Sequence, residues 1–435
     1  MVMKKLIVFS VVFALVAGAA FAVDLGGNVI GTVTFLEGSN LKDANDDPTP
    51  MSASGILNRI RLEGSGENDD GTFGAWVRFQ PSWDGGSPDY GKDSQAWGYA
   101  WWKPIDLLKI MIGGNAGDGF YGKEGVTGWG FYQTASDTGV VNPNSVWGST
   151  DSYYTYDAYG AGEVDFGFIY RNAFYGGYGD AGLHLTVSPV DMVDINIVVP
   201  YWRNAEAQYV YKYTVAQVDL KMDFGNIALT YVGNENKLDY AGDACDPATF
   251  FLYFGLTSIE NLGIDVGIGF PLPLKDDETD GVTYTVVSPI SAGLGVKYTT
   301  GSFGIKARLA AGFGGSISAE YDSGTSPDPN KIPLKLLADI LPFYNVSDTL
   351  RIFFSAGLGI TGATEKNEKA LTPVPADIDA IVGWHINPYV EVGAEWGPKF
   401  LAGIQIWSAG IEKTANDGDS ALVKWAIPLA MHIGF

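Results

Sequence analysis

Charged side chains recur at every second position in several short stretches of this sequence. Because successive side chains of a β-strand point to opposite faces, these charges would share one face of an extended segment. Fixed charges along a wall of strands solvate that wall and act electrostatically on ions or polar solutes beside it. The residues concerned are Arg59, Arg61 and Glu63, then Arg78 beside the polar-face Trp76, and then Lys306 and Arg308.

Groups suited to covalent catalysis are sparse. The three histidines, His184, His385 and His432, stand far apart, and the chain contains neither His-Glu-x-x-His nor Gly-x-Ser-x-Gly. The lone Cys245 offers no paired chemistry and no intramolecular disulfide. We therefore expect the protein not to be an enzyme.

Two short stretches match ligand-binding patterns only by letter. Residues 117–122 have the glycine spacing of a dinucleotide fingerprint, but no strand–helix–strand pattern surrounds them. Asp43, Asn45 and Asp47 have the spacing of a calcium loop, yet Pro48 occupies the place of the required glycine. We expect neither a cofactor nor a metal site.

The faces opposite to the charges are apolar. In residues 73–79, Phe73, Ala75, Val77 and Phe79 alternate with Gly74, Trp76 and Arg78, and residues 217–224, 303–310 and 390–396 repeat the pattern. Either a soluble half-buried sheet or a membrane barrel fits such strands. Glycine and alanine on the polar faces, and Trp or Tyr near strand ends, favour the barrel.

The first 22 residues predict export. Lys4 and Lys5 precede an apolar run over residues 6–17, and Ala20 and Ala22 form a small-x-small cleavage site. The run is too short to span a bilayer as a helix. We therefore divide the chain into a signal peptide, residues 1–22, and a mature unit, residues 23–435.

Composition agrees with an all-β protein. The chain is 46% hydrophobic and 13% aromatic, with 57 glycines among 435 residues, and its apolar residues come in short pieces. No linker divides it, which indicates one large closed unit. The net charge of −23 argues against binding to nucleic acid, because the chain would repel phosphates.

The last strand resembles the ending of bacterial outer-membrane proteins. Its alternating apolar residues end in a terminal aromatic residue, and they are Trp425, Ile427, Leu429, Met431, Ile433 and Phe435. In that family such an ending is read by the barrel-assembly machinery. The resemblance, together with a style of strand similar to spirochaete outer-membrane proteins, implies a Gram-negative or spirochaete outer-membrane location and a single transmembrane antiparallel β-barrel.

Short and long connections alternate along the chain. Turn-forming residues predict tight reversals at residues 67–71, 103–106, 188–191, 223–226, 258–261, 299–302 and 345–349. Longer polar stretches lie at residues 37–53, 81–94, 114–151, 233–248, 271–289, 315–331, 361–377 and 410–420. This asymmetry predicts short periplasmic turns, long outer loops and an even number of strands, about 16 to 18. In residues 378–409, Asn387-Pro388 and Gly397-Pro398 each fit either a turn or a kink.

Residues 57–79 resemble an early hairpin of the trimeric general porins. The resemblance implies that Arg59, Arg61 and Arg78 line the pore opposite an acidic loop carrying Asp118 and Glu124. This loop lacks the Pro-Glu-Phe-Gly-Gly stretch of that family, so its folding into the pore stays open. The inward parity of Lys306 and Arg308 adds them to the pore-lining set.

A porin-type channel for passive diffusion of small hydrophilic solutes or ions is the function that these features predict. Its partners would be outer-membrane lipid and further copies in a homotrimer. Trp76, Trp97 and Trp129 fit either a sugar-stacking track or packing at the wall. The alternatives are a surface adhesin or structural barrel with ligand-binding outer loops, and a secreted soluble β-sandwich.

Overall fold

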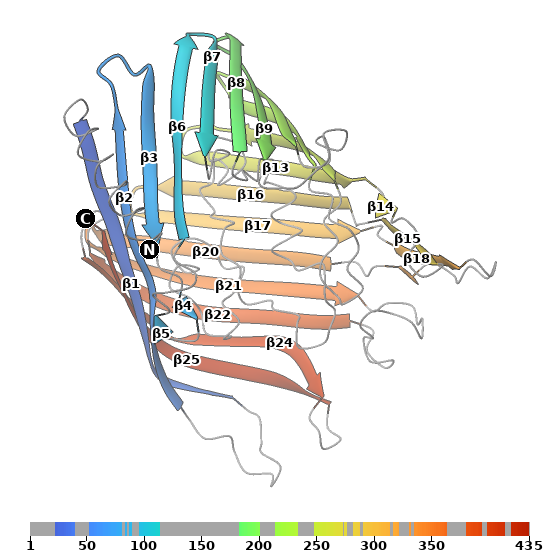
Figure 1. Ribbon diagram of the computed structural model, residues 1–435. Coiled ribbons are helices and arrows are strands. Elements are labelled where there is room, and N and C mark those ends of the chain that lie inside the picture. The colour runs from blue at the N-terminus through green and yellow to red at the C-terminus, as the bar shows by residue number, and fades with distance from the viewer. Residues whose placement is uncertain are drawn as a thin grey trace.

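The computed structural model describes residues 22–39, 52–80, 83–84, 87–88, 95–113, 182–200, 214–233, 248–272, 274–275, 282–287, 290–313, 316–321, 330–331, 335–362, 380–393, 398–413 and 419–434. Every regular element in these ranges is a β-strand (Figure 1). No helix within them has the length and apolar content needed to cross a membrane. The strands are β1 (Ala22–Ser39), β2 (Ser52–Glu67), β3 (Phe73–Gln80), β4 (Trp83–Asp84), β5 (Ser87–Pro88), β6 (Gln95–Ile105), β7 (Leu108–Gly113), β8 (Gly182–Val190), β9 (Val193–Pro200), β10 (Val215–Met222), β11 (Gly225–Val232), β12 (Thr249–Leu256), β13 (Leu262–Pro271), β14 (Leu274–Lys275), β15 (Val282–Val287), β16 (Ile290–Thr300), β17 (Phe303–Phe313), β18 (Ser316–Tyr321), β19 (Asn330–Lys331), β20 (Lys335–Ser347), β21 (Leu350–Gly362), β22 (Ala380–Gly393), β23 (Pro398–Gly403), β24 (Gln405–Lys413) and β25 (Asp419–Gly434).

Nineteen strands form one antiparallel sheet whose pairings close into a ring. From β1 to β22, each strand pairs with the next strand of this sheet along the chain, and β25 pairs back onto β1 over eleven residue pairs, from Asn28↔Gly434 to Ser39↔Lys424. Strands β23 and β24 both pair with β22 and β25 and are separated only by Ile404, so together they fill one position. Merging these two of the nineteen leaves 18 positions, an even number within the expected range. The fold is therefore an all-β antiparallel barrel without the unpaired edges that a bilayer does not tolerate.

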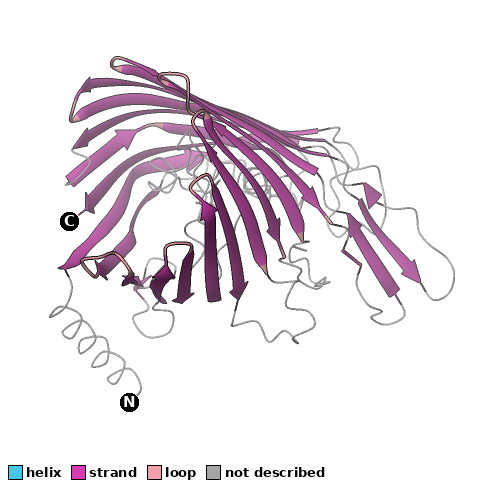
Figure 2. Ribbon diagram, turned by 90° about the horizontal axis from the view of Figure 1, so that it is seen from above, coloured by secondary structure: helices cyan, strands magenta, loops and turns pink. Residues whose placement is uncertain are grey.

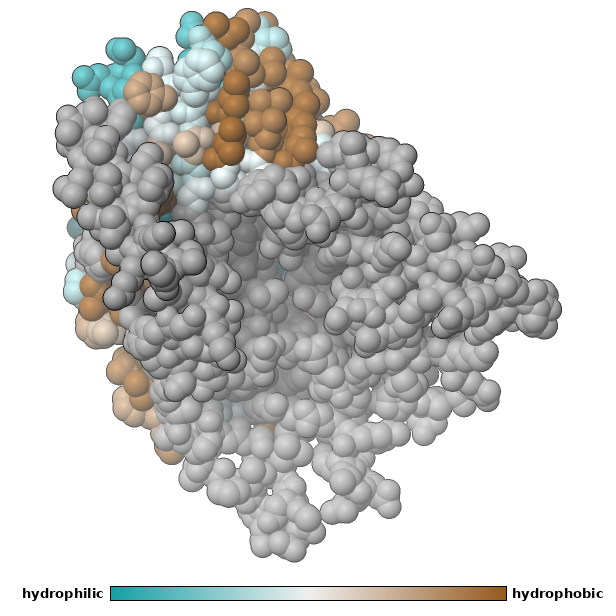
Figure 3. Space-filling view, viewed as in Figure 1, coloured by the Kyte–Doolittle hydropathy of each residue, from teal (hydrophilic) through white to brown (hydrophobic). Residues whose placement is uncertain are grey.

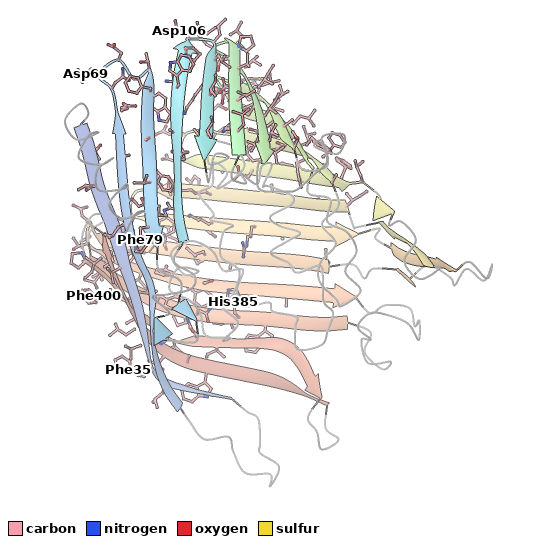
Figure 4. All side chains as sticks on the ribbon, in the orientation of Figure 1. Phe35, Asp69, Phe79, Asp106, His385 and Phe400 are labelled. Carbon is pink, nitrogen blue, oxygen red and sulfur yellow. The ribbon has the colours of Figure 1, made fainter. Side chains whose placement is uncertain are left out.

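The seven predicted short turns are all present. Figure 4 places Asp69 and Asp106, at the tips of β2–β3 and β6–β7, at the same end of the barrel. In the first of these turns the Asn68 side chain accepts hydrogen bonds from the backbone N–H groups of Thr72 and Phe73, at 2.8 and 2.9 Å, and Gly71 adopts a φ of +60°. The turns predicted at 103–106 and 188–191 lie about two residues further along the chain, because β6 and β8 continue to Ile105 and Val190.

Two of the expected long loops contain strands instead. Strands β14, β15, β18 and β19 fall within residues 271–289 and 315–331, and they form a separate four-stranded sheet. This small sheet, defined here as the outer sheet, stands off from the curved wall of the barrel on the side away from the short turns (Figures 1 and 2). The outer sheet therefore lengthens two neighbouring hairpins, β13–β16 and β17–β20, beyond the length that a bilayer requires.

Asn387-Pro388 is not a turn. Both residues lie inside β22, with Pro388 opposite Phe354 on β21. Proline has no N–H to donate, and on its other side the Pro388 carbonyl accepts a hydrogen bond from Ile404 N at 3.1 Å. Because Ile404 is the residue that separates β23 from β24, this proline lies beside the break between these two strands. The loop predicted at 114–151 and the segment 394–397 lie outside the described residues.

Candidate pore wall

Neighbouring residues on one strand show how the wall is oriented. On β17, Arg308 is 1% exposed, whereas the adjacent Leu309 is 54% exposed. On β10 the same reversal separates Asp219, 0% exposed, from Val218, 39% exposed. Charged groups therefore lie inside the ring of strands, and large apolar groups lie outside it.

The outward face is apolar over most of the ring. Figure 4 shows Phe35 and Phe400 on the outer side of their strands and His385 on the inner side of β22. In the coloured part of Figure 3, apolar residues gather over β7–β9, away from the hydrophilic tip of the β2–β3 hairpin. Exposed apolar side chains of this kind include Ile112, Leu183, Leu229, Leu252, Val266, Leu309, Ile340, Leu358, Ile386, Val390 and Met431.

Such a surface would be costly in water, since soluble monomers rarely expose contiguous apolar patches of more than a few hundred Å². A lipid-facing apolar band around a polar interior is the arrangement of transmembrane β-barrels. Exposed Trp102 and Tyr344 lie near the short-turn end, where aromatic residues meet the membrane interface. The polarity of the two faces identifies the fold as a transmembrane β-barrel.

A hydrogen-bonded polar ladder crosses the inner faces of β8 to β11. Thr186 Oγ1 donates to Asn196 Oδ1 at 2.8 Å, and the register places Asn196 opposite Gln217. Gln217 Nε2 in turn donates to Thr230 Oγ1 at 2.9 Å. These groups are amides and hydroxyls, and three of them, Asn196, Gln217 and Thr230, are buried, so their hydrogen bonds link the inner faces of the four strands.

A second inner row combines charges with glycines. Cross-strand register runs from Asp265 on β13 through Gly295 on β16 to Arg308 on β17. Asp265 accepts a 2.5 Å hydrogen bond from the Tyr253 hydroxyl and is fully buried, as is Arg308. Because glycine carries no side chain, Gly295 leaves the inner face of β16 open to the side chains of Asp265 and Arg308.

Acidic groups concentrate on β9 and β10 at the short-turn end. Asp194 and Asp219 lie directly opposite each other across the two strands. Asp194 accepts a hydrogen bond from Ser188 Oγ at 2.7 Å and forms an ion pair with Lys221. Like charges placed opposite each other oppose strand pairing, so the Lys221 ammonium offsets part of this repulsion.

The structure locates three of the seven predicted pore-lining side chains. Arg78 on β3 forms an ion pair with Glu63 at 2.6 Å, and its guanidinium lies 4.6 Å from the centre of the Trp76 ring. Lys306 and Arg308 both lie on β17, where Lys306 is opposite Lys297. These three side chains come from two separated parts of the ring rather than from one cluster.

The remaining predicted residues are placed less completely or not at all. Arg59 and Arg61 lie on β2, opposite Ile30 and Asn28, but their side chains are outside the description. Asp118 and Glu124 lie outside the described residues, so their approach to the arginines remains a prediction.

Trp76 stacks on Tyr99 at a centroid distance of 5.3 Å, in agreement with an inward aromatic surface. Among the described residues, no group of three or more His, Cys, Asp or Glu side chains is arranged to hold a metal ion.

The C-terminal strand carries the predicted alternation and completes the ring. On β25, Ile427 and Met431 are exposed, while Ala426 between Trp425 and Ile427 is fully buried. The register with β1 runs through Val29↔Ile433 and Val33↔Leu429. Phe435 lies outside the described residues.

Several inner-face residues did not stand out in the sequence. Asp194, Asp265 and Lys109 lie in short strands in which each is the only charge, or one of two, so alternation of charge gave no signal. Each of these residues alternates with apolar neighbours that face outward, as Asp265 does with the exposed Val266. This alternation is the signal that would have identified them as inner-face residues.

Comparison with known proteins adds only remote likenesses. No family model matches the chain, and no curated protein matches its sequence. Among solved structures, it is similar to an anion-selective porin from Comamonas acidovorans, with 10% identity, a TM-score of 0.49 and coverage of 95% of this chain and 100% of that one. It is also similar to the outer membrane channel DcaP of Acinetobacter baumannii, with 10% identity, a TM-score of 0.47 and coverage of 96% of this chain and 98% of that one. Salmonella typhi OmpF in complex with daunomycin is similar with 11% identity, a TM-score of 0.45 and coverage of 96% of this chain and 99% of that one.

Proposed function

We propose that the protein is an outer-membrane channel for the passive diffusion of small hydrophilic solutes or ions. The observation that carries the proposal is the buried, hydrogen-bonding and charged inner face of a closed ring whose outer face is apolar. A wall lined with carboxylates, amides and ammonium groups replaces part of the hydration of a polar solute, and it gives an apolar solute no comparable partner.

The proposed mechanism needs no cofactor and no covalent step. Solutes would move down their gradient past Arg78 on β3, past Lys306 and Arg308 on β17, and past Asp194 and Asp219 on β9 and β10. Because Lys306 and Arg308 lie on β17 while Asp194 and Asp219 lie on β9 and β10, a transverse field would cross the lumen between these strands and align dipolar solutes. Arg59, Arg61, Asp118 and Glu124 are proposed as further members of this lining.

Planar-bilayer recording tests the proposal. The purified mature chain, residues 23–435, is expected to insert and to produce stepwise conductance increments in a salt gradient. A chain that assembles as a barrel in vesicles yet produces no increments would contradict the channel.

A second candidate is a surface barrel that binds molecules through its outer connections. The outer sheet favours it, because four strands beyond the barrel form a structured platform. Replacing residues 273–288 and 314–334 by short glycine-serine turns separates the two functions. A channel keeps its conductance in this variant, whereas a surface-binding barrel loses attachment to its target surface.

The location follows from the same proposal. Residues 1–22 would direct export, and residues 425–435 would be read by the barrel-assembly machinery. Removing Phe435 is expected to lower the assembled fraction in cells, measured as heat-modifiable barrel on gels, while refolding in detergent remains. A homotrimer is a further expectation, tested by cross-linking in native membranes.

A further inference from the structure

Two lysines share one tryptophan ring at the short-turn end of the barrel. The Nζ atoms of Lys103 and Lys109 lie 5.3 and 5.2 Å from the centre of the Trp101 ring. Lys103 comes from the end of β6, and Lys109 comes from the start of β7. The turn between these strands, at Asp106 and Leu107, therefore brings both ammonium groups to one place.

The Trp101 side chain faces inward and is closely packed. It is opposite Met111 on β7, which is buried, whereas the neighbouring Trp102 and Ile112 are exposed on the lipid side. On its other side it is opposite Gly74, where an added Cβ would lie 2.7 Å from the indole. The glycine thus lets the indole lie close over β3, which fixes the surface on which the lysines rest.

Among the described residues, neither ammonium group forms an ion pair with a carboxylate. Across the described ranges, no carboxylate lies within ion-pair distance of either lysine, although such pairs are present at Arg78–Glu63 and at Lys221–Asp194. Glu67, at the end of β2, is in the same cross-strand row through Gly74 and is the nearest acidic position by register. A tryptophan face stabilises one cation modestly, and it does not remove the repulsion between two.

We propose that Trp101, Lys103 and Lys109 form a binding site for a dianionic phosphate group on small solutes at the short-turn mouth of the channel. Two ammonium groups match the charge of a dianion, and each can donate charge-assisted hydrogen bonds to its oxygens. The indole presents an apolar surface beside this pair for the rest of the solute. The site deepens the proposed channel function, since it would capture phosphorylated solutes where they enter or leave the pore.

Two measurements test the site, with inorganic phosphate as the probe. The first is calorimetric titration of the mature protein in maltoside micelles free of phospholipid. The second is block of chloride conductance in phospholipid bilayers, with phosphate added to one side at a time. Binding in micelles, together with block from one side only, is the expected result.

Substitutions of single charged residues should change the phosphate affinity in opposite directions. Lys103→Gln and Lys109→Gln are each expected to weaken phosphate binding by roughly tenfold, since each removes a charge-assisted contact. Glu67→Gln is expected to strengthen it, because it removes the nearest competing carboxylate. The matched control is Lys399→Gln, which removes a lysine from the short-turn end of β23 and is expected to leave phosphate affinity unchanged.

The outcomes separate the site from the channel. Conductance without any phosphate effect, or equal affinity in all lysine variants, would overturn the site and leave the channel standing. Phosphate binding in micelles without conductance would support the site and overturn the channel. Binding in micelles without block in phospholipid bilayers would assign the lysines to lipid headgroups, and it would overturn a site for solutes.

Discussion

A charge placed on the outward face of β17 should disrupt the barrel far more than a charge on a soluble surface would. Leu309 is 54% exposed and lies near the middle of its strand, where the lipid contact is deepest. Full transfer of a leucine side chain is worth about 1.5–3 kcal/mol. About half of that, roughly 0.8–1.5 kcal/mol, should be lost in Leu309→Ala.

Leu309→Arg should cost more, because a charged side chain near the midplane of a barrel costs a further 2–4 kcal/mol, approximately. The expected total is about 3–5 kcal/mol. The assay is reversible urea unfolding in lipid vesicles, followed by tryptophan fluorescence. Ser302→Arg, at the exposed β16–β17 turn, is the control and should change the free energy of unfolding by less than about 0.5 kcal/mol.

Refutation would come from Leu309→Arg unfolding at the same urea concentration as the unmodified chain. An exposed leucine of a soluble protein accepts arginine without loss. Such a result would mean that water, and not lipid, covers this face.

Other substitutions probe the inner wall. Gly304→Ala should destabilise the barrel by about 1–3 kcal/mol, because its Cβ would fall 2.1 Å from Cζ of Phe343. Adding Phe343→Leu to the same chain should restore part of this loss in the urea assay. If Gly304→Ala alone left the stability unchanged, the Phe343 ring would be free to move. Tyr253→Phe removes the donor to the buried Asp265 and should cost about 1.5–3 kcal/mol. The control is Tyr344→Phe at an exposed position of β20, and equal midpoints for both variants would show that the hydrogen bond to Asp265 is not needed.

Much of the barrel was readable from alternation alone. The stretches containing Arg308 and Asp219 predict strands with one charged face, and the structure confirms that the charged side is the inner one. The turns were also predictable, because residues such as Asn68 and Gly301 favour tight reversals. The even number of strands follows from the alternation of short and long connections.

Other features depend on pairing between distant strands. The outer sheet forms because β15 pairs with β18, which belongs to a different connection of the barrel, and local composition contains no sign of that contact. The irregular position at Ile404 likewise depends on Pro388, sixteen residues earlier in the chain and on the neighbouring strand. The Trp101 site was missed because Lys103 read as a turn residue and Lys109 is the only charge in β7.

The most direct test of the two-faced wall compares thiols on opposite faces of β17. Cys245 is the only cysteine, so Cys245→Ser provides a thiol-free background for Lys306→Cys and Leu309→Cys. With the barrel in vesicles, a charged, membrane-impermeant thiol reagent should modify the cysteine at 306 and reduce the single-channel current. The cysteine at 309 should react only with a lipid-soluble reagent. Modification of position 309 by the charged reagent, with position 306 protected, would contradict a wall that is polar inside and apolar outside.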